Sequence, residues 1–180
     1  CVKKVKNLEG LDLSSLRIIA NGAEPIRKEV LDTFHDKFKE VGFKPNVFSP
    51  CYGLAEATLA VTVKPYGEQC KHIYCTPESL KRGKLVLKEK SDVCIVSTGV
   101  PVSQDVVAIY NVSKQRECSE LEVGEISLLR ENKSMSKGYY ARNKDKDKDI
   151  QIGGRGYFGT GDLGTLFKGE LYVTGRIKEL

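Results

Sequence analysis

The stretch that decides the fold reads LRIIANGAEPIRKEVLDTFHDKF over residues 16–38. Its first five residues form a short apolar, β-branched run that ends at Asn21-Gly22, which predicts a buried strand leading into a tight loop. From Pro25 the period changes, because apolar residues recur every three or four positions and Gly42 follows the last of them. This spacing predicts an amphipathic helix that begins at Pro25 and ends before Gly42.

The residues that follow predict a return to the same sheet. Residues 45–52 (PNVFSPCY) look like an extended segment that runs into a turn at Gly53, and residues 54–63 are apolar enough to be buried. A strand, a helix and a strand in this order indicate an α/β unit with a parallel sheet.

The rest of the chain changes character twice. Residues 64–91 are polar and rich in turn signals, which predicts an inserted loop or hairpin. Beyond them come short alternating runs, with Lys168-Gly169 as a hairpin turn, and these predict an antiparallel sheet or small barrel. The expected fold is α/β: a parallel-sheet αβ unit (1–63), a polar insertion (64–93) and an antiparallel β-barrel-like subdomain (94–180).

The composition excludes several classes of function. The 180 residues are 40% hydrophobic and carry an intermixed net charge of +5, so neither disorder nor nucleic-acid binding is expected. No apolar run approaches the ~20 residues that a membrane-spanning helix requires.

Residues 143–149 (NKDKDKD) alternate in charge and predict a solvated loop without function. Six cysteines without a C-x-x-C pair indicate reduced thiols and a cytoplasmic location.

Four patches combine glycines with polar groups that fit poorly in a plain core. They are Asn21 to Pro25, Tyr52 to Thr58, Thr160 to Asp162 and Gly175 to Lys178. In the first patch, free backbone N–H groups could bind an anionic ligand. In the second, the tyrosine ring could stack on a base and the glutamate could hold Mg²⁺. In the third, the aspartate could accept hydrogen bonds from sugar hydroxyls. Each patch also has a plain structural explanation: a turn glycine, a core tyrosine, an Asx turn or a surface ion pair. Their order along the chain favours one nucleotide site.

The same residues carry a resemblance to a known family. The stretches 13–38, 48–62 (FSPCYGLAEATLAVT), 157–164 (YFGTGDLG) and 169–180 (GELYVTGRIKEL) resemble the adenylate-forming enzymes, most of all the fatty acyl-AMP ligases. The resemblance implies that a fatty acid is joined to ATP as an acyl-adenylate. It also implies transfer of the acyl group to the thiol of an acyl carrier protein or of a polyketide synthase carrier domain. ATP/AMP and Mg²⁺ are the implied cofactors.

The resemblance further implies roles for residues at matching motif positions. Seven of them would surround the adenosine: Gly22, Ala23, Glu24, Tyr52, Gly53, Asp162 and Arg176. Among these, Tyr52 would stack on the base and Asp162 would bind the ribose hydroxyls. The catalytic pair would be Glu56, as the magnesium ligand, and Thr58, as a phosphate contact. Lys178 matches the hinge about which the family's C-terminal domain turns.

The insertion and the two ends of the chain refine this expectation. In the family, an insertion at this position restrains the C-terminal domain and disfavours chemistry with CoA, which favours a ligase over an acyl-CoA synthetase. The family's phosphate loop and catalytic lysine match nothing here, and the hinge pair reads Lys178-Glu179 instead of Lys-Asp. We therefore expect the later half of a large N-terminal domain. An acyl-CoA synthetase fragment and a non-catalytic adenylate-binding module remain as alternatives.

The fragment expectation has a direct test. Alone, residues 1–180 should bind nucleotide weakly and should not turn over. Incubating the isolated chain with ATP, Mg²⁺ and a fatty acid checks this, and robust release of pyrophosphate would contradict it.

Overall fold

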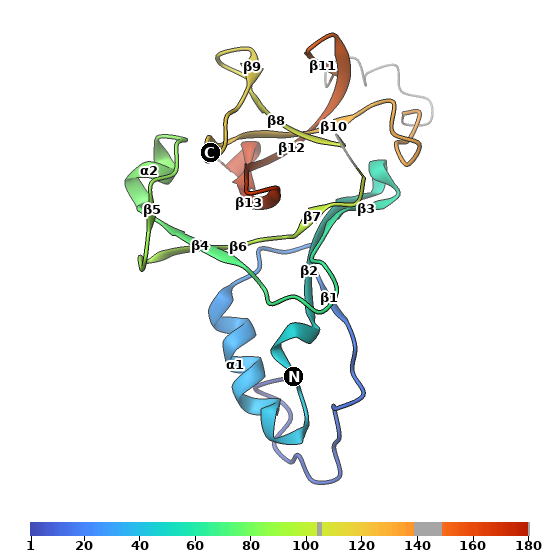
Figure 1. The fold of residues 1–180 in the computed structure, drawn as a ribbon, viewed down its shortest axis with the longest axis vertical. Helices are drawn as coiled ribbons and strands as arrows, with labels where there is room; N and C mark the ends of the chain where they lie inside the picture. Colours follow the sequence, from blue (N-terminus) through green and yellow to red (C-terminus); the bar gives the residue numbers. More distant parts are fainter. Residues whose placement is uncertain (104–105, 139–148, 180) are drawn as a thin grey trace.

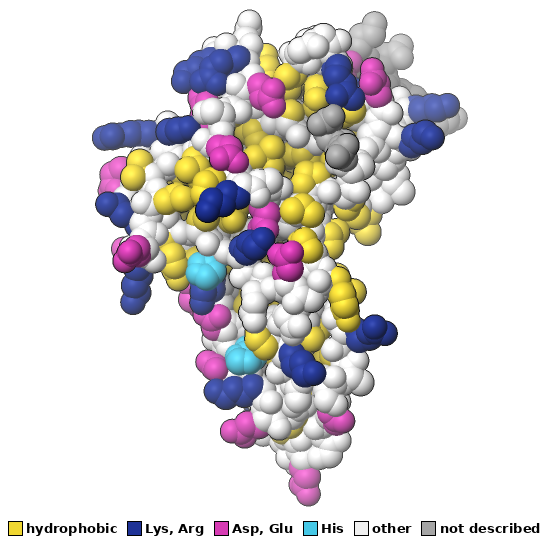
Figure 2. Space-filling view, viewed as in Figure 1, with side chains coloured by type: hydrophobic (Ala, Val, Ile, Leu, Met, Phe, Trp, Pro, Cys, Tyr) yellow, Lys and Arg dark blue, Asp and Glu magenta, His cyan; other side chains and the backbone are white. Residues whose placement is uncertain are grey.

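The computed structural model describes residues 1–103, 106–138 and 149–179. Figure 1 shows a narrow part, which holds the N-terminus and the longest helix, beneath a broad part made of strands. Basic and acidic side chains are interspersed on the face drawn in Figure 2, and hydrophobic side chains gather over the strand-rich part. Among the described helices, none combines the length and the apolar character that a membrane crossing needs.

The first sheet contains the parallel unit that the sequence predicts. It has the order β1-β2-β3-β7. These strands are β1 Ile19–Asn21, β2 Phe48–Leu54, β3 Leu59–Val63 and β7 Val100–Pro101. β1 and β2 are parallel, with Ile19 opposite Phe48, and helix α1 (Lys28–Phe38) connects them. The predicted strand, helix and parallel strand are therefore confirmed.

Helix α1 packs on this sheet through aromatic side chains. Phe34 contacts Phe38, Phe43 and Phe48, with ring centroids 4.6, 5.0 and 5.5 Å apart. Leu31, Phe38, Phe43 and Phe48 are all buried in this cluster. Such tilted and edge-on ring pairs stabilise a core beyond the area that they bury. The hydrophobic period therefore describes the buried face of the helix correctly for Leu31, Phe34 and Phe38, whereas Val30, which belongs to the same predicted series, is 58% exposed.

The boundaries of the predicted elements are wrong in three places. α1 begins at Lys28 rather than Pro25, and its last turn continues as the 3₁₀ helix η1 (Lys39–Val41), which ends at Gly42 with φ 87°. Residues 45–47 form the 3₁₀ helix η2 (Pro45–Val47) instead of extended chain. Gly53 lies inside β2 instead of at a turn. Pro25 lies three residues before the first residue of α1, whereas Pro45 is itself the first residue of η2. A proline favours the first turn of a helix, but its position alone does not fix where the helix begins.

Residues 54–63 form no single buried segment. A short 3₁₀ helix, η3 (Ala55–Ala57), interrupts them, and β3 then returns antiparallel to β2. Val61 is buried, whereas Leu59 is 72% exposed. An apolar run carries no information about strand direction, which explains why this hairpin was not anticipated.

The polar insertion is ordered. Its elements are β4 His72–Cys75, α2 Pro77–Lys81 and β5 Leu87–Lys88. β4 pairs with β5 on one side and with β6 (Val93–Val96) on the other, so the expected loop or hairpin forms most of a three-stranded antiparallel sheet. Thr76 caps α2, because its side chain accepts a hydrogen bond from the N–H of Ser79.

The last sheet is antiparallel, as the alternating runs predict. Its order is β11-β12-β10-β8-β9, and β13 also pairs with β12. The strands are β8 Val107–Asn111, β9 Arg116–Glu117, β10 Gly124–Leu129, β11 Asp149–Ile152, β12 Arg155–Phe167 and β13 Glu170–Arg176. The predicted turn at Lys168-Gly169 joins β12 to β13, and both residues have positive φ. Within the described ranges this sheet forms no closed barrel.

Two expectations fall partly or wholly outside these observations. Of the predicted solvated loop at 143–149, residues 143–148 lie outside the described part of the chain. Asp149 opens β11, where its carboxylate pairs with Arg130 at 2.7 Å. The division into 1–63, 64–93 and 94–180 stays a prediction, and β6 and β7 pair with strands from before residue 93.

A buried carboxylate stabilises the β8–β9 region. The side chain of Glu122 is 8% exposed and lies 2.7 Å from the guanidinium of Arg116 and 3.4 Å from the ammonium of Lys114. The Arg116 hydrogen bond, aided by a backbone N–H of Ser119, lowers the pKa of Glu122 from 4.5 to about 2. The ionised form is therefore the one that the folded state favours.

Replacing Glu122 by glutamine should reduce the free energy of unfolding by about 1–3 kcal/mol near neutral pH. Because the folded-state pKa is depressed, this stabilisation is fully present above pH 4.5 and is lost as the pH falls towards 2. Urea denaturation at about pH 7 and about pH 3 measures the difference. Glu117→Gln, on exposed β9, is the control. An E122Q deficit of equal size at both pH values would contradict this account.

Candidate functional site

Two of the predicted site residues meet directly, although 110 positions separate them in the sequence. The phenol of Tyr52, on β2, donates a hydrogen bond of 2.8 Å to the Oδ2 atom of Asp162, on β12. The contact joins the first sheet to the last one. The sequence-based hypothesis required these two groups to converge, and the structure places them in contact.

Asp162 is held from several sides. Its other oxygen, Oδ1, lies 3.2 Å from Nε of Arg176, which faces it across the β12–β13 pair. The backbone N–H of Asp162 donates to the Thr160 hydroxyl at 3.1 Å, and that hydroxyl donates to the carbonyl of Ile126 at 2.8 Å. The carboxylate therefore has a fixed position on a paired strand, with 20% of its side chain exposed.

Sequence reasoning missed one residue of this arrangement. Glu125, on β10, accepts a hydrogen bond of 2.9 Å from the N–H of Gly161, directly before Asp162. Glu125 also fills the space in which a side chain at Gly159 would lie, because a Cβ there would come within 2.6 Å of its Oε1 atom. The available signal was an acidic residue in the stretch GEISLLR, whose other members include three apolar residues of a predicted strand.

The protonation state of Tyr52 is fixed by its surroundings. Burial raises the pKa of its phenol well above the ordinary value, and the neighbouring Asp162 carboxylate raises it further. The phenol therefore remains a hydrogen-bond donor at every physiological pH, and it acts as an anchor rather than as a proton-transfer group.

A cavity of about 550 Å³ opens beside Tyr52. Four predicted adenosine residues line it: Gly22, Ala23, Tyr52 and Gly53. Glu24, Asp162 and Arg176 are not among the lining residues, and Glu24 is exposed on the bend that follows β1. Gly22 and Ala23 form the loop between β1 and α1, where Ala23 has φ 68°. The structure thus brings together the glycine-bearing loop and the aromatic ring.

The two predicted catalytic residues follow β2 directly. Glu56 lies in η3, and its carbonyl accepts a hydrogen bond of 2.7 Å from the N–H of Ser136. The Thr58 hydroxyl donates to the carbonyl of Ser134 at 2.6 Å. Thr58 and Leu59 both have positive φ, 51° and 82°. Two successive non-glycine residues in this region persist only where the surroundings enforce the conformation.

The carboxylate of Glu56, two positions before Thr58, is compatible with Mg²⁺ bound together with a nucleotide. The described residues contain no group of three or more His, Cys, Asp or Glu side chains that could hold a metal by themselves. Mg²⁺ in nucleotide enzymes is usually held by one or two carboxylates, with the remaining positions taken by phosphate oxygens and water. Glu56 would supply one carboxylate of such a site.

The predicted hinge residue is accessible. Lys178 lies in the 3₁₀ helix η5 (Ile177–Glu179), which follows β13, and its side chain is exposed. β13 thus connects the Arg176–Asp162 pair to this residue within two positions.

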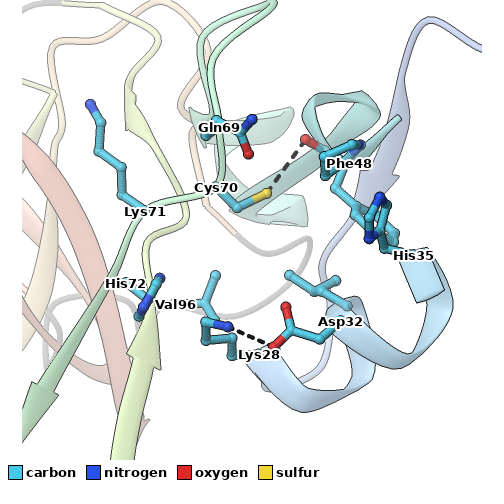
Figure 3. Close-up of a pocket in the computed structure, with 11 residues that line it drawn as sticks. Lys28, Asp32, His35, Phe48, Gln69, Cys70, Lys71, His72 and Val96 are labelled. Carbon is cyan, nitrogen blue, oxygen red and sulfur yellow. Dashed lines mark hydrogen bonds and ion pairs between the residues drawn. The ribbon is translucent and has the colours of Figure 1, made fainter. Parts of the chain in front are cut away.

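A second pocket, of about 210 Å³, lies between α1 and the segment 69–72 (Figure 3). Its charged groups are already engaged. Lys28 pairs with Asp32 at 2.6 Å, and the Cys70 thiol donates to the carbonyl of Phe48 at 3.7 Å. Lys71 extends away from the pocket in Figure 3 and pairs with the buried Glu170. The Cys70 and Lys71 contacts connect the insertion to β2 and β13.

Comparison with known proteins identifies the class. Residues 2–140 match the model of the AMP-binding enzyme family. The chain therefore belongs to the AMP-binding enzymes.

Individual relatives narrow the resemblance. The chain is 41% identical to a medium-chain-fatty-acid–[acyl-carrier-protein] ligase, JamA, of Moorena producens, over 94% of this chain and 30% of that protein. The crystal structure of a fatty acid AMP ligase from Legionella pneumophila superposes with a TM-score of 0.90 at 38% identity, over 98% of this chain and 32% of that one.

A fatty acyl-adenylate ligase of Legionella pneumophila, solved with acyl adenylate and pyrophosphate, gives a TM-score of 0.85 at 39% identity. It is covered to the same extents, 98% of this chain and 32% of that one. The chain thus spans about a third of the length of the proteins that it matches. The resemblance to fatty acyl-AMP ligases is confirmed.

Proposed function

We propose that the protein containing this chain activates a fatty acid with ATP to form an acyl-adenylate. We further propose that it passes the acyl group to the thiol of an acyl carrier protein or of a polyketide synthase carrier domain. The observation that carries the proposal is the contact of 2.8 Å between the Tyr52 phenol and the Asp162 carboxylate. The adenylate in the Legionella structure and the carrier protein in the name of the JamA ligase support it.

In this proposal the nucleotide is held at both ends of the adenosine. The adenine lies against the Tyr52 ring and the Gly22–Ala23 loop, where small side chains let a flat base approach the backbone. Asp162 accepts hydrogen bonds from the ribose hydroxyls, and Arg176 orients its carboxylate through the contact of 3.2 Å. Glu24 would reach the base from the exposed end of the loop.

The reacting phosphate lies beyond the ribose, towards η3. Glu56 would hold Mg²⁺ there, and Mg²⁺ would neutralise charge on the phosphate oxygens. For Thr58 to donate to a phosphate, its hydroxyl would have to exchange the carbonyl of Ser134 for that oxygen. A fatty carboxylate oxygen attacks the α-phosphorus, and the bond to pyrophosphate breaks. Rigid binding of the adenosine orients this attack, a contribution that reaches several kcal/mol.

The second step needs a different partner. The carrier thiol loses its proton to solvent, and its sulfur attacks the acyl carbonyl. The bond between the acyl carbon and the phosphate oxygen then breaks, and AMP leaves. Lys178 would be the hinge about which a C-terminal domain turns between the two steps. We also place the protein in the cytoplasm, which is supported by its six free cysteines, because thiols persist in a reducing compartment.

The proposal is tested on the product of the full coding sequence. With ATP, Mg²⁺ and dodecanoic acid, pyrophosphate should be released, and the acyl group should appear on a phosphopantetheinylated carrier protein in preference to CoA. Preferred transfer to CoA would favour an acyl-CoA synthetase instead. Failure to form any acyl-adenylate would leave a non-catalytic adenylate-binding module.

A further inference from the structure

The apolar part of the cavity beside Tyr52 has walls from three segments. Its apolar lining comes from Ile18, Ala20, Val47, Leu59, Ala60 and Val63. These residues belong to β1, β3 and the segments beside them. Tyr66 and Gly67 close the cavity on the insertion side. Such a lining suits an apolar chain, which would share the cavity with the adenine that the proposed function places against Tyr52 and the Gly22–Ala23 loop.

The wall on the insertion side is a single turn. The N–H of Glu68 donates to the carbonyl of Pro65 at 3.3 Å, and Gly67 has φ 81°, the geometry of a type II turn. Tyr66 is 67% exposed at the tip of this turn. The Arg17 guanidinium donates a hydrogen bond to the Tyr66 phenol oxygen, which raises the pKa of Arg17, so the tip reaches across to the residues before β1.

Lys64 lies at the base of this turn and is buried, with 7% of its surface exposed. Its ammonium donates to three backbone carbonyls: Glu68 at 2.6 Å, Pro65 at 3.1 Å and Asn46 at 3.2 Å. Two of these acceptors belong to the turn, and the third belongs to η2, beside β2. The ammonium therefore ties the turn to the sheet.

The Lys64 ammonium is held by hydrogen bonds to backbone carbonyls rather than by an ion pair. Among the described residues, no carboxylate lies within 4.0 Å of the Lys64 nitrogen. An ammonium has three N–H donors, and all three have an acceptor. Buried lysines are rare unless such partners compensate for the loss of water. The backbone N–H of Lys64 adds a hydrogen bond of 3.0 Å to the carbonyl of Pro50.

We propose that Lys64 is a positioning residue: its ammonium fixes the turn at 65–68 as one wall of the cavity and so sets which fatty chains the cavity accepts. The inference rests on the proposed function. Lys64 itself lines the cavity beside Tyr66 and Gly67. Because all three of its N–H donors bind backbone carbonyls, it acts by holding these two residues in place rather than by donating a hydrogen bond to the substrate.

The test compares Lys64→Met with wild type in the product of the full coding sequence. K64M should raise the KM for dodecanoic acid roughly five- to tenfold and leave the KM for ATP and kcat within about twofold, the pattern of lost ground-state binding. The preference among octanoic, dodecanoic and hexadecanoic acids should flatten. K64R, which keeps a cation, should recover most of the affinity. K84M is the control, since the exposed Lys84 also binds a backbone carbonyl, that of Glu120 at 2.8 Å, away from the cavity.

A second variant covers the case in which K64M folds poorly. Tyr66→Ala removes the wall itself from an exposed position and should shift the KM for dodecanoic acid in the same way. The double variant should be no worse than either single one, because both remove the same wall. Additive effects, or equal changes in the KM for both substrates, would overturn the proposal.

A further measurement separates this inference from the proposed function. Chymotrypsin should cleave after Tyr66 faster in K64M than in wild type or K84M, whether or not the protein makes an adenylate. A wild-type protein without fatty-acid-dependent pyrophosphate release would overturn the proposed function and the substrate role of Lys64 together. Activity in wild type with unchanged K64M kinetics and cleavage would overturn the inference alone.

Discussion

Replacing Asp162 by alanine should lower fatty-acid-dependent exchange of pyrophosphate into ATP by about a hundredfold or more. The variant loses two carboxylate oxygens, one facing the Tyr52 phenol at 2.8 Å and one facing Arg176 at 3.2 Å. Charge-assisted hydrogen bonds contribute about 1.5–3 kcal/mol each. The binding energy gained at the ribose is used to orient the reacting phosphorus, so its loss lowers the rate. Exchange kinetics on the product of the full coding sequence measure the loss.

The control for Asp162 must separate a lost ligand contact from a weakened sheet. Asp149→Ala serves this purpose, because Asp149, in β11 of the same sheet, also pairs with an arginine, Arg130, which directly follows β10, at 2.7 Å. It should leave the exchange rate within about twofold of wild type. An Asp162→Ala protein that is folded and fully active would show that the carboxylate does not hold the nucleotide.

Replacing Gly53 by alanine should have the largest effect on folding. A Cβ at this position would lie 1.6 Å from the carbonyl oxygen of Leu59 and 2.6 Å from its carbon. Both atoms belong to the backbone of the paired strand β3, next to a bulge in the β2–β3 register. The strands would have to separate, so we expect a loss of about 3 kcal/mol or more in the free energy of unfolding. Urea denaturation measures this loss.

Gly156→Ala is the matched control, since Gly156 is also a strand glycine but an added Cβ would meet only ordinary contacts, the nearest at 3.6 Å. It should unfold within about 0.5 kcal/mol of wild type. If the two variants unfold at the same urea concentration, the close approach of β2 and β3 is not a constraint on this fold.

Periodicity predicted those features that depend on local pattern. The alternating runs gave the antiparallel sheet, and the three-to-four spacing gave the buried face of α1, because hydrophobic burial follows the geometry of each element. The order of the glycine-bearing patches also predicted that Tyr52 and Asp162 would meet. This was possible because both residues lie in strands whose arrangement the family resemblance implies.

Other features depend on tertiary contacts that no local pattern records. Glu125 supports Gly161, the residue before Asp162 in β12, only because β10 pairs with β12. Lys64 is buried only because three carbonyls from two segments surround its ammonium. The start of α1 was misplaced since Arg27, its N-cap residue, has no capping hydrogen bond that would mark it. The direction of β3 depends on η3, whose short length gives no periodic signal.

The left-handed backbone at Leu59 has an evolutionary consequence. Its φ of 82° would suit glycine, yet the position carries a large side chain that is 72% exposed and forms part of the cavity wall. Leu59→Gly would relieve the backbone but would remove that wall. Selection for thermal robustness and selection for a shaped cavity therefore oppose each other at this one position, so a sequence optimised only for stability would drift away from leucine here.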